Sequence, residues 1–188
     1  MKRLVTFALV LALVGCQSSK KAKTEAAPAA ECDVGPPACY PDLDMTNLEG
    51  AVFTKDAMRG KVIIVNFWAT WCKPCLKEIP ALSKYYAEHK EKGLEIIGVL
   101  NEDGVSQEVL ERFKKRTGMS FPLVVFDDAV LSAWNYPDRL PTTFIYDRSG
   151  RLETQKIGAI SEAELDEIIG KLLAEKPPAD KPSAAPAK

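Results

Sequence analysis

The feature that most constrains the fold is an apolar run over residues 61–68, Lys-Val-Ile-Ile-Val-Asn-Phe-Trp, in which β-branched and aromatic side chains dominate. A half-buried strand alternates apolar and polar residues, whereas a continuous run is typical of a strand buried on both faces. A central strand covered on each side is therefore predicted. The segment Trp71-Cys72-Lys73-Pro74-Cys75 follows this strand almost at once.

The rest of the pattern alternates between helical and extended segments. Helices are predicted over residues 73–91, 105–117, 129–134 and 161–174, and strands over 94–100, 121–126, 142–147 and 152–157. This order predicts an α/β fold with a mixed central β-sheet flanked by helices. One further strand at about 43–45 is expected as an N-terminal extension at an edge of the sheet.

Local signals set several boundaries. Val109, Leu110 and Phe113 lie at helical spacing in the second helix, and Gly118 is expected to end that helix. Ser161 and Glu164 predict a capping box at the start of the last helix. Residues 148–150, Arg-Ser-Gly, predict a hairpin turn between the last two strands.

Residues 1–15 are interpreted as a lipoprotein signal peptide. Two basic residues precede an apolar run over 4–14, which is too short for a membrane-spanning helix because such a helix takes ~20 residues. The run ends Leu-Val-Gly-Cys, which resembles a bacterial lipobox and implies acylation of Cys16. The alternative is ordinary cleavage, with Cys16 as an unrelated thiol.

Two segments are expected to lie outside the folded domain. Residues 16–37 are interpreted as a lipid-anchored flexible tether, because 17–31 contain no aliphatic side chain larger than Ala. Residues 176–188 are a Pro-, Ala- and Lys-rich segment of the same kind and are expected to be a disordered tail. The folded domain is therefore placed at 38–175.

The five cysteines are an odd number for an exported protein. Acylation of Cys16 would leave two close pairs, as expected outside the reducing cytosol. Cys32 and Cys39 flank a Gly-Pro-Pro turn signal. The pair has four possible interpretations: a structural disulfide at the junction of tether and domain, a second redox pair exchanging with Cys72, free thiols, or a metal site. The formal net charge of −1 argues against a nucleic-acid-binding surface.

Cys72 and Cys75 lie where the buried strand gives way to a predicted helix. Unpaired N–H groups and the positive end of the helix dipole favour a thiolate there. We expect Cys72 at the N-cap as the exposed attacking sulfur, and Cys75, more buried, as the sulfur that resolves a mixed disulfide. Lys73 adds a positive charge beside the thiolate. The alternatives are a structural disulfide, or half of a zinc site completed from Cys32, Cys39 and His89.

The segment Asn66-Phe67-Trp68-Ala69-Thr70-Trp71-Cys72-Lys73-Pro74-Cys75 strongly resembles the active-site segment of thioredoxin-like proteins. Asn66, Thr70 and Glu78-Ile79-Pro80 are similar to the TlpA/ResA-like, membrane-tethered branch. Leu140-Pro141-Thr142-Thr143-Phe144 resembles the family's cis-proline segment, and Asp147-Arg148-Ser149-Gly150 with Gly158 resembles its terminal hairpin. The likeness covers about residues 42–173 and implies a thioredoxin fold.

The resemblance implies three residues that meet the substrate. Pro141 would form a cis peptide bond and pack beside the sulfurs, and the alternative is an ordinary proline at the start of a strand. The backbone of Leu140 would pair with a bound peptide. Trp71 is expected to border the site, whereas Trp68 is expected in the core.

The resemblance also implies a proton carrier. Thioredoxin has a buried aspartate in the strand before its active site, and the matching residue here is Asn66, which cannot take a proton. Glu78 is the expected substitute, because it follows Cys75 by three residues on the same side of the helix. Burial would raise the pKa of its carboxyl and suit it to relay protons near neutral pH. The alternative is a solvated surface glutamate.

The implied activity is thiol–disulfide exchange with protein thiols and disulfides, without a cofactor or a metal. The branch implies a monomeric reductase fed by a membrane electron donor, often serving cytochrome c maturation. Its place would be the cell envelope, facing the periplasm or the extracytoplasmic space. Gln17 and Ser18 after Cys16 suggest the outer membrane.

Two other functions are open. A thiol peroxidase would need a hydroxyl and an arginine near the reactive cysteine, and the segment around Cys72 offers no such arginine. A lipid-anchored copper-binding or chaperone module would have wider cysteine spacing and a histidine near the cis-proline segment. No histidine follows His89 in this sequence.

Overall fold

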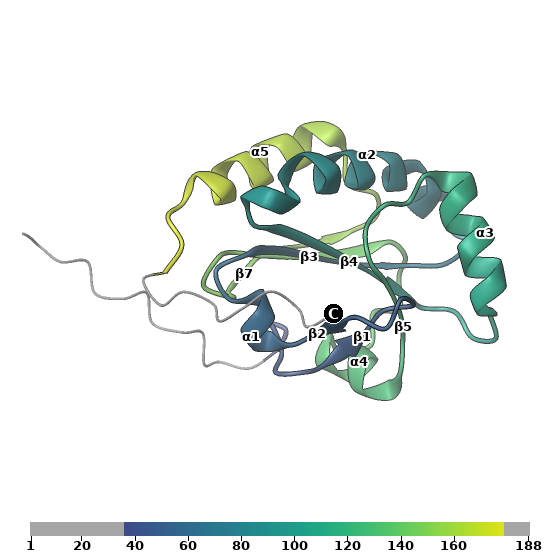
Figure 1. Cartoon of the computed structure of the whole chain (residues 1–188). Helices are drawn as coiled ribbons and strands as arrows, with labels where there is room; N and C mark the ends of the chain where they lie inside the picture. The colour runs from purple at the N-terminus through teal and green to yellow at the C-terminus, as the bar shows by residue number, and fades with distance from the viewer. Residues whose placement is uncertain (1–35, 179–188) are drawn as a thin grey trace, which may run out of the picture.

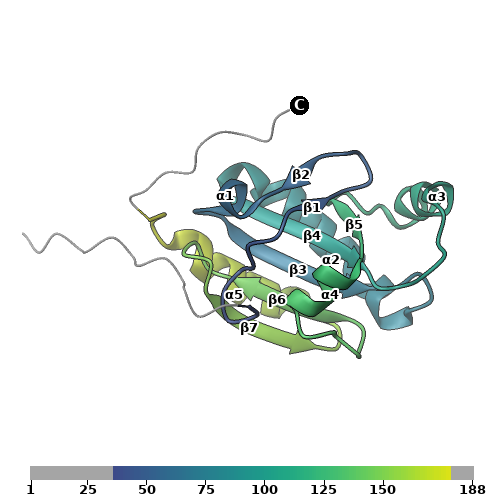
Figure 2. The ribbon, with the colours of Figure 1, turned by 90° about the horizontal axis from the view of Figure 1, so that it is seen from below.

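The fold is built on a five-stranded mixed sheet, seen here in a computed structural model that describes residues 36–178. The strands are β3 (Val62–Trp68), β4 (Leu94–Leu100), β5 (Leu123–Val125), β6 (Thr142–Tyr146) and β7 (Leu152–Ile157). Their spatial order is β5-β4-β3-β6-β7, with β3, β4 and β5 parallel and β6 and β7 antiparallel to their neighbours (Figure 2). The predicted mixed sheet is therefore confirmed.

Helices cover both faces of this sheet. The helical segments are α1 (Lys55–Met58), α2 (Lys73–His89), the 3-10 turn η1 (Lys90–Lys92), α3 (Gln107–Thr117), α4 (Asp128–Ala133) and α5 (Glu162–Ala174). Figure 1 shows α2 and α5 side by side above the sheet, α3 beyond the β5 edge, and α1 and α4 below. No helix within residues 36–178 is long and apolar enough to cross a bilayer.

The predicted central strand is confirmed as β3. Val62, Ile64 and Trp68 point into the core beneath α2 and α5, whereas Val65 and Phe67 point into the core on the other face. Every residue of the strand is buried. The apolar run is continuous because both of its faces need apolar partners.

The local boundary signals act as predicted. Gly118 ends α3 with a φ of 71°, in the left-handed region that glycine adopts without strain. Ser161 and Glu164 form the capping box of α5. Of the three apolar residues at helical spacing on α3, Leu110 and Phe113 contact the core, whereas Val109 is 39% exposed.

The N-terminal extension differs from the expected edge strand. Strand β1 (Met45–Thr46) pairs with β2 (Val52–Phe53) in a separate two-stranded sheet below the main one. The reason is local, because Asn47 and Ala51 close a tight turn with two hydrogen bonds and fold the chain back on itself. A single bridge between Asn47 and Val124 links this hairpin to β5.

An earlier segment does reach an edge of the main sheet. The N–H of Tyr40 donates to the carbonyl of Gly150 at 2.8 Å, and the N–H of Leu152 donates to the carbonyl of Ala38 at 2.9 Å. Residues 38–40 therefore lie along the start of β7. The predictions for residues 1–35, including Cys16 and Cys32, and for 179–188 fall outside the described residues.

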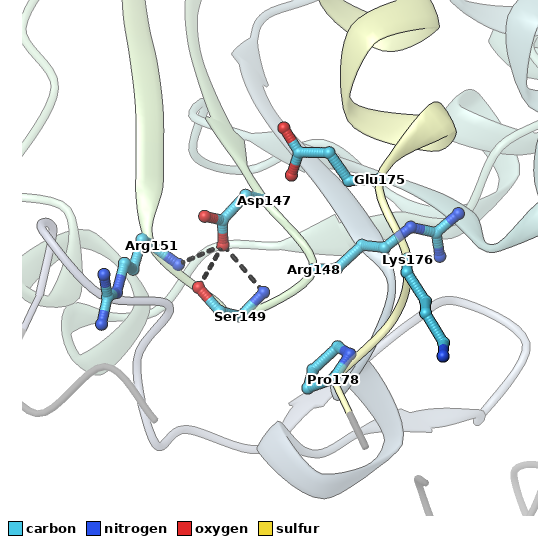
Figure 3. A pocket seen from close by; sticks show the side chains of 7 residues that line it. All are labelled: Asp147, Arg148, Ser149, Arg151, Glu175, Lys176 and Pro178. Atoms are coloured by element: carbon cyan, nitrogen blue, oxygen red, sulfur yellow. Dashed lines mark hydrogen bonds between the residues drawn. The ribbon is translucent and has the colours of Figure 1, made fainter. Parts of the chain in front are cut away.

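The turn between β6 and β7 is held by one carboxylate. Asp147 Oδ1 accepts hydrogen bonds from the N–H of Ser149 (2.8 Å), the hydroxyl of Ser149 (2.7 Å) and the N–H of Arg151 (2.9 Å), as Figure 3 shows. This turn and the chain after α5, at Glu175, line a hollow. The strand register places the hollow at the end of the sheet away from Cys72.

Arg148 joins three further segments to this turn. Its guanidinium donates to the backbone carbonyls of Gly60 (2.8 Å), Lys92 (3.2 Å) and Leu173 (3.2 Å). These carbonyls belong to the approach to β3, to η1 and to the end of α5. A buried cation with three carbonyl partners therefore fastens this end of the fold.

Arg148→Met should destabilise the protein, because it leaves three partly buried carbonyls without their donor. We expect a loss of about 2–4 kcal/mol in the free energy of unfolding, measured by urea titration. Arg112→Met is the matched control, because Arg112 is exposed and pairs only with Glu108 one turn away on α3. Its loss should stay below about 0.5 kcal/mol. Equal losses in the two variants would contradict the fastening role.

Candidate active site at the start of helix α2

Cys72 and Cys75 form a disulfide at the start of α2, with their Cα atoms 5.3 Å apart. The predicted N-cap is confirmed, because Cys72 has an extended backbone and its Sγ accepts the N–H of Cys75 at 3.3 Å. Pro74 lies in the first turn, where no intrahelical donor is lost. The Cys72 sulfur thus accepts one of the N–H groups that are unpaired at the start of the helix.

The exposure of the sulfurs differs from the prediction. Cys75 is fully buried, as expected, but Cys72 is only 3% exposed and its side chain packs in the upper core. The bond to Cys75 holds its sulfur over the first turn of α2, so the expected exposed sulfur is wrong for this oxidised form. Trp71 is 66% exposed and borders the site, whereas Trp68 is buried.

The cis-proline prediction is confirmed. The Leu140–Pro141 peptide bond is cis, Leu140 is half-buried and Pro141 is buried. Thr142 pairs with Phe67 in the ladder between β6 and β3, so Pro141 lies at the end of β3 from which the chain runs to Cys72. The carbonyl of Pro141 accepts the N–H of Gly158 at 2.8 Å.

Glu78 is buried on α2, only 2% exposed, so the surface reading is wrong. Its Oε1 accepts the side-chain N–H of Asn66 at 2.8 Å, and its Oε2 accepts the backbone N–H of Ile160 at 2.9 Å. Burial raises the pKa of the Glu78 carboxyl, and the two hydrogen bonds oppose this without cancelling it. The expected buried carboxyl with a raised pKa is therefore confirmed.

Asn66, which stands where thioredoxin has a buried aspartate, is a hydrogen-bond partner of Glu78. Its Nδ2 donates to Glu78 and, at 2.9 Å, to the hydroxyl of Thr143 on the neighbouring strand. Its Oδ1 is buried and has no hydrogen-bond partner. Turning the amide over would offer this oxygen to a protonated Glu78, so Asn66 can serve both states of the carboxyl. A polar residue inside an apolar run was the sequence signal for such a partner.

The strand register separates Cys39 from the site. Cys39 is disulfide-bonded and pairs with Arg151, just before β7, whereas Cys72 follows the opposite end of β3. The four residue steps from Thr142 to Tyr146 alone span ~13 Å along β6. Cys39 is too far from Cys72 for direct exchange in this fold. Its proposed partner, Cys32, lies outside the described residues, so that pairing stays a prediction.

The histidine considered for a zinc site is also remote. His89 ends α2, and the 17 residues of this helix span ~25 Å from the start where Cys72 lies. His89 cannot share a metal with Cys72. In residues 36–178 there is no group of three or more His, Cys, Asp or Glu side chains that could hold a metal ion.

Two residues after β4 contact the site without a sequence signal of their own. Glu102 accepts hydrogen bonds from Thr70, two residues before Cys72, and Asn101 donates to the carbonyl of Pro137, four residues before Pro141. Polar residues in a connection are ordinary, and only the fold brings these two to the redox site.

A Cys-X-X-Cys disulfide at the start of the helix that follows a central strand, with a cis-proline at the same end of that strand, is the arrangement of a thioredoxin-like thiol–disulfide oxidoreductase. This chain has that fold and that cysteine pair. The model of the AhpC/TSA family matches residues 36–155. The thiol-disulfide oxidoreductase ResA of Geobacillus kaustophilus is 37% identical over 128 residues, covering 67% of this chain and 71% of that protein. The chain belongs to the AhpC/TSA family and, within it, to the ResA-type thiol–disulfide oxidoreductases.

Solved structures agree with this assignment. A thiol:disulfide interchange protein of the thioredoxin family from Chlorobium tepidum is similar with a TM-score of 0.65 and 28% identity, over 77% of this chain and 100% of that one. StoA from Bacillus subtilis is similar with a TM-score of 0.58 and 29% identity, over 70% of this chain and 98% of that one.

Glu78→Gln should become more stable relative to the wild-type protein as the pH rises. The raised pKa means that the folded state keeps the Glu78 proton at pH values where the unfolded chain, near the ordinary 4.5, has lost it. The wild-type protein therefore loses stability as pH rises from that value through the raised pKa. The free energy of unfolding of the variant, relative to wild type, should increase across this window in urea titrations.

Glu164→Gln is the control of opposite sign. Lys156 and Ser161 hold the pKa of Glu164 down to about 2, so the charged carboxylate stabilises the fold above the ordinary value. This variant should lose stability relative to wild type as pH rises from about 2 through 4.5. A pH-independent difference for Glu78→Gln would show that the carboxyl is not perturbed by burial.

Proposed function

We propose that this chain is an extracytoplasmic protein-disulfide reductase in which Cys72 attacks and Cys75 resolves. The observation that carries the proposal is the Cys72–Cys75 pair at the N-terminus of α2, with the buried Glu78 on the same helix. The helix end favours a thiolate at Cys72, since this side chain meets the N–H of Cys75 directly. Cys75 is fully buried, which suits it to the second step.

The reaction has two exchange steps. In the reduced protein, the Cys72 thiolate attacks one sulfur of a client disulfide, forms a mixed disulfide and releases the first client thiolate. Cys75, as a thiolate, then attacks the Cys72 sulfur, which closes the Cys72–Cys75 bond and releases the second client thiolate. Two electrons pass from the protein to the client, and each client thiolate takes up a proton.

Glu78 is proposed to take the proton that Cys75 must lose. The two residues are three positions apart on α2 and therefore share one side of the helix. A buried carboxyl with a raised pKa can both accept this proton and return it near neutral pH. Asn66 and the N–H of Ile160 fix the carboxylate for this exchange.

The client is proposed to bind as an extended segment across the end of the sheet. The backbone of Leu140 would pair with it, Pro141 would pack beside the sulfurs, and Trp71 would cover its flank. The half-buried Leu140 and the exposed ring of Trp71 support this path, because both present surface beside the disulfide. An exposed aromatic side chain beside a reactive group is a frequent contact in protein recognition.

The location is proposed from the N-terminal sequence. Residues 1–15 carry the features of a lipoprotein signal peptide, and acylation of Cys16 would tether the domain to a membrane of the cell envelope, with the outer membrane favoured by Gln17 and Ser18. The disulfide state of Cys39 agrees with an oxidising compartment. We propose Cys32 as its partner, in a structural bond.

The direction and the client are proposed from the relatives. The similar proteins named thiol-disulfide oxidoreductase ResA support disulfide exchange as the activity. From the resemblance to the TlpA/ResA-like branch, we propose a reductase that receives two electrons from a membrane donor and serves cytochrome c maturation. The protein is proposed to act as a monomer, since one chain holds both cysteines, Glu78 and Pro141.

Cys75→Ser should trap the client, because the mixed disulfide on Cys72 then has no internal sulfur to resolve it. We expect disulfide-linked adducts in the native cell that disappear on reduction, detected by non-reducing gels and mass spectrometry. Cys72→Ser is the matched control and should trap nothing. Adducts of equal yield in both variants, or activity that survives Cys72→Ser, would overturn the order of attack.

The direction of electron flow is tested by the reduction potential of the Cys72–Cys75 couple. A reductase is expected near the thioredoxin value of about −270 mV, with reduction of insulin, whereas a strong oxidant would lie near about −120 mV. A potential close to the second value would contradict the reductase proposal. Peroxide consumption faster than insulin reduction would favour the thiol peroxidase, and stoichiometric copper in the purified protein would favour the copper module.

A further inference from the structure

The loop between β3 and α2 depends on a carboxylate from another element. Glu102, which follows β4, accepts the backbone N–H of Thr70 at 2.7 Å through Oε2. The hydroxyl of Thr70 lies 2.7 Å from the same oxygen and 3.0 Å from Oε1. The remaining backbone bond of this loop is the N–H of Cys72 to the carbonyl of Ala69 at 3.2 Å. Glu102 thus takes two donors from Thr70 and links this loop to the connection after β4.

The neighbouring residue reaches the other side of the site. The N–H of Asn101 donates to the carbonyl of Trp68 at 2.8 Å, where β3 ends. Its side-chain Nδ2 donates to the carbonyl of Pro137 at 3.1 Å, in the segment that leads to Pro141. Asn101 and Glu102 are thus bonded to both segments between which an extended client would lie.

We propose that Glu102 is a positioning residue of the redox site, which holds the Thr70–Cys72 loop in place relative to the segment before Pro141, where Asn101 bonds the carbonyl of Pro137. Glu102 touches neither sulfur and acts through Thr70. Thr70 is bonded to Glu102, and Pro137 is bonded to the preceding residue, Asn101. A shift of either segment would therefore break a hydrogen bond to the connection after β4. The width of the client-binding gap is therefore set by the connection after β4.

The charge of Glu102 has a second effect. The carboxylate of Glu102 contacts Thr70, which precedes Cys72 by two residues, and a negative charge there would oppose a Cys72 thiolate, whereas the end of α2 favours it. The geometric effect and the charge effect can be separated by substitution. Gln at 102 keeps one oxygen, which can accept both Thr70 donors as Oε2 does now, but it carries no charge. Ala at 102 removes both the bonds and the charge.

The test compares a protein client with a small reagent. The substrate is a disulfide-bonded polypeptide, which the reduced protein reduces. For Glu102→Ala, we expect the KM for this polypeptide to rise about 10-fold, because a small displacement of the segments that bind a substrate weakens its binding. The rate with a small disulfide, which needs no gap, should change less than about 3-fold. For Glu102→Gln, KM should stay near wild type, while the pH midpoint of Cys72 alkylation should fall by about 0.5 to 1.

Asp103→Asn is the matched control, since it removes the same charge from the next, exposed position. Its KM should equal that of wild type, and its alkylation midpoint should move less than that of Glu102→Gln. Thr70→Val removes only the hydroxyl bond and should raise KM by about 3-fold, which keeps the test open if Glu102→Ala does not fold. Wild-type KM in both Glu102→Ala and Thr70→Val would overturn the proposal.

The role of Glu102 rests on the proposed function, in which Cys72 is the attacking sulfur. Failure of the Glu102 role and failure of the Cys72 assignment give different results. If the assignment is wrong, Cys72 of the wild-type protein will be alkylated no faster than Cys75. If only the role of Glu102 is wrong, Cys72 will be alkylated faster than Cys75 in every variant. The KM for the polypeptide will then stay unchanged when the hydrogen bonds between Glu102 and Thr70 are removed.

Discussion

The structure depends on the burial of β3 between two apolar layers. Each layer needs the residues that β3 directs to it, so the strand cannot slip by one residue without exchanging its two faces. This constraint fixes the point at which the chain leaves the sheet after Trp68. It thereby fixes where α2 begins and where Cys72 and Cys75 lie. The chemistry of the site is set by the place at which a rigid strand ends.

The partners of β3 complete the site. Its ladder with β6 brings Thr143 opposite Asn66 and places Pro141 beyond the end of the strand. Its ladder with β4 brings the residues after Leu100 beside the redox loop, where Glu102 meets Thr70. The Cys72–Cys75 disulfide, Pro141 and the buried Glu78 thus lie toward the end of the sheet at which β3 and β4 end and β6 begins. The opposite end of the sheet is held by Arg148 and carries no part of this chemistry.

The polar groups near the redox site differ in burial and in hydrogen bonding. Glu78 accepts two hydrogen bonds, yet burial still raises its pKa. Asn66 carries an unpaired oxygen beside it, a cost that a purely structural core would avoid. Glu102 is half-buried and accepts both the N–H and the hydroxyl of Thr70, which suits the proposed support of the loop. Position and solvation, rather than residue type, separate these two glutamates.

Most of the helices and strands and the reactive pair could be predicted from the sequence, because periodicity, capping residues and the Cys-X-X-Cys spacing are local properties. The sequence predicted β3 as the central strand, the capping box at Ser161 and the cis bond at Pro141, the last through family likeness. The burial of Cys72, the exposure of Val109 and the separate pairing of β1 with β2 became known from the folded structure. The folded structure alone placed Cys39 far from Cys72 and Glu102 beside Thr70, because contacts between residues distant in the chain depend on strand register, which no local pattern records.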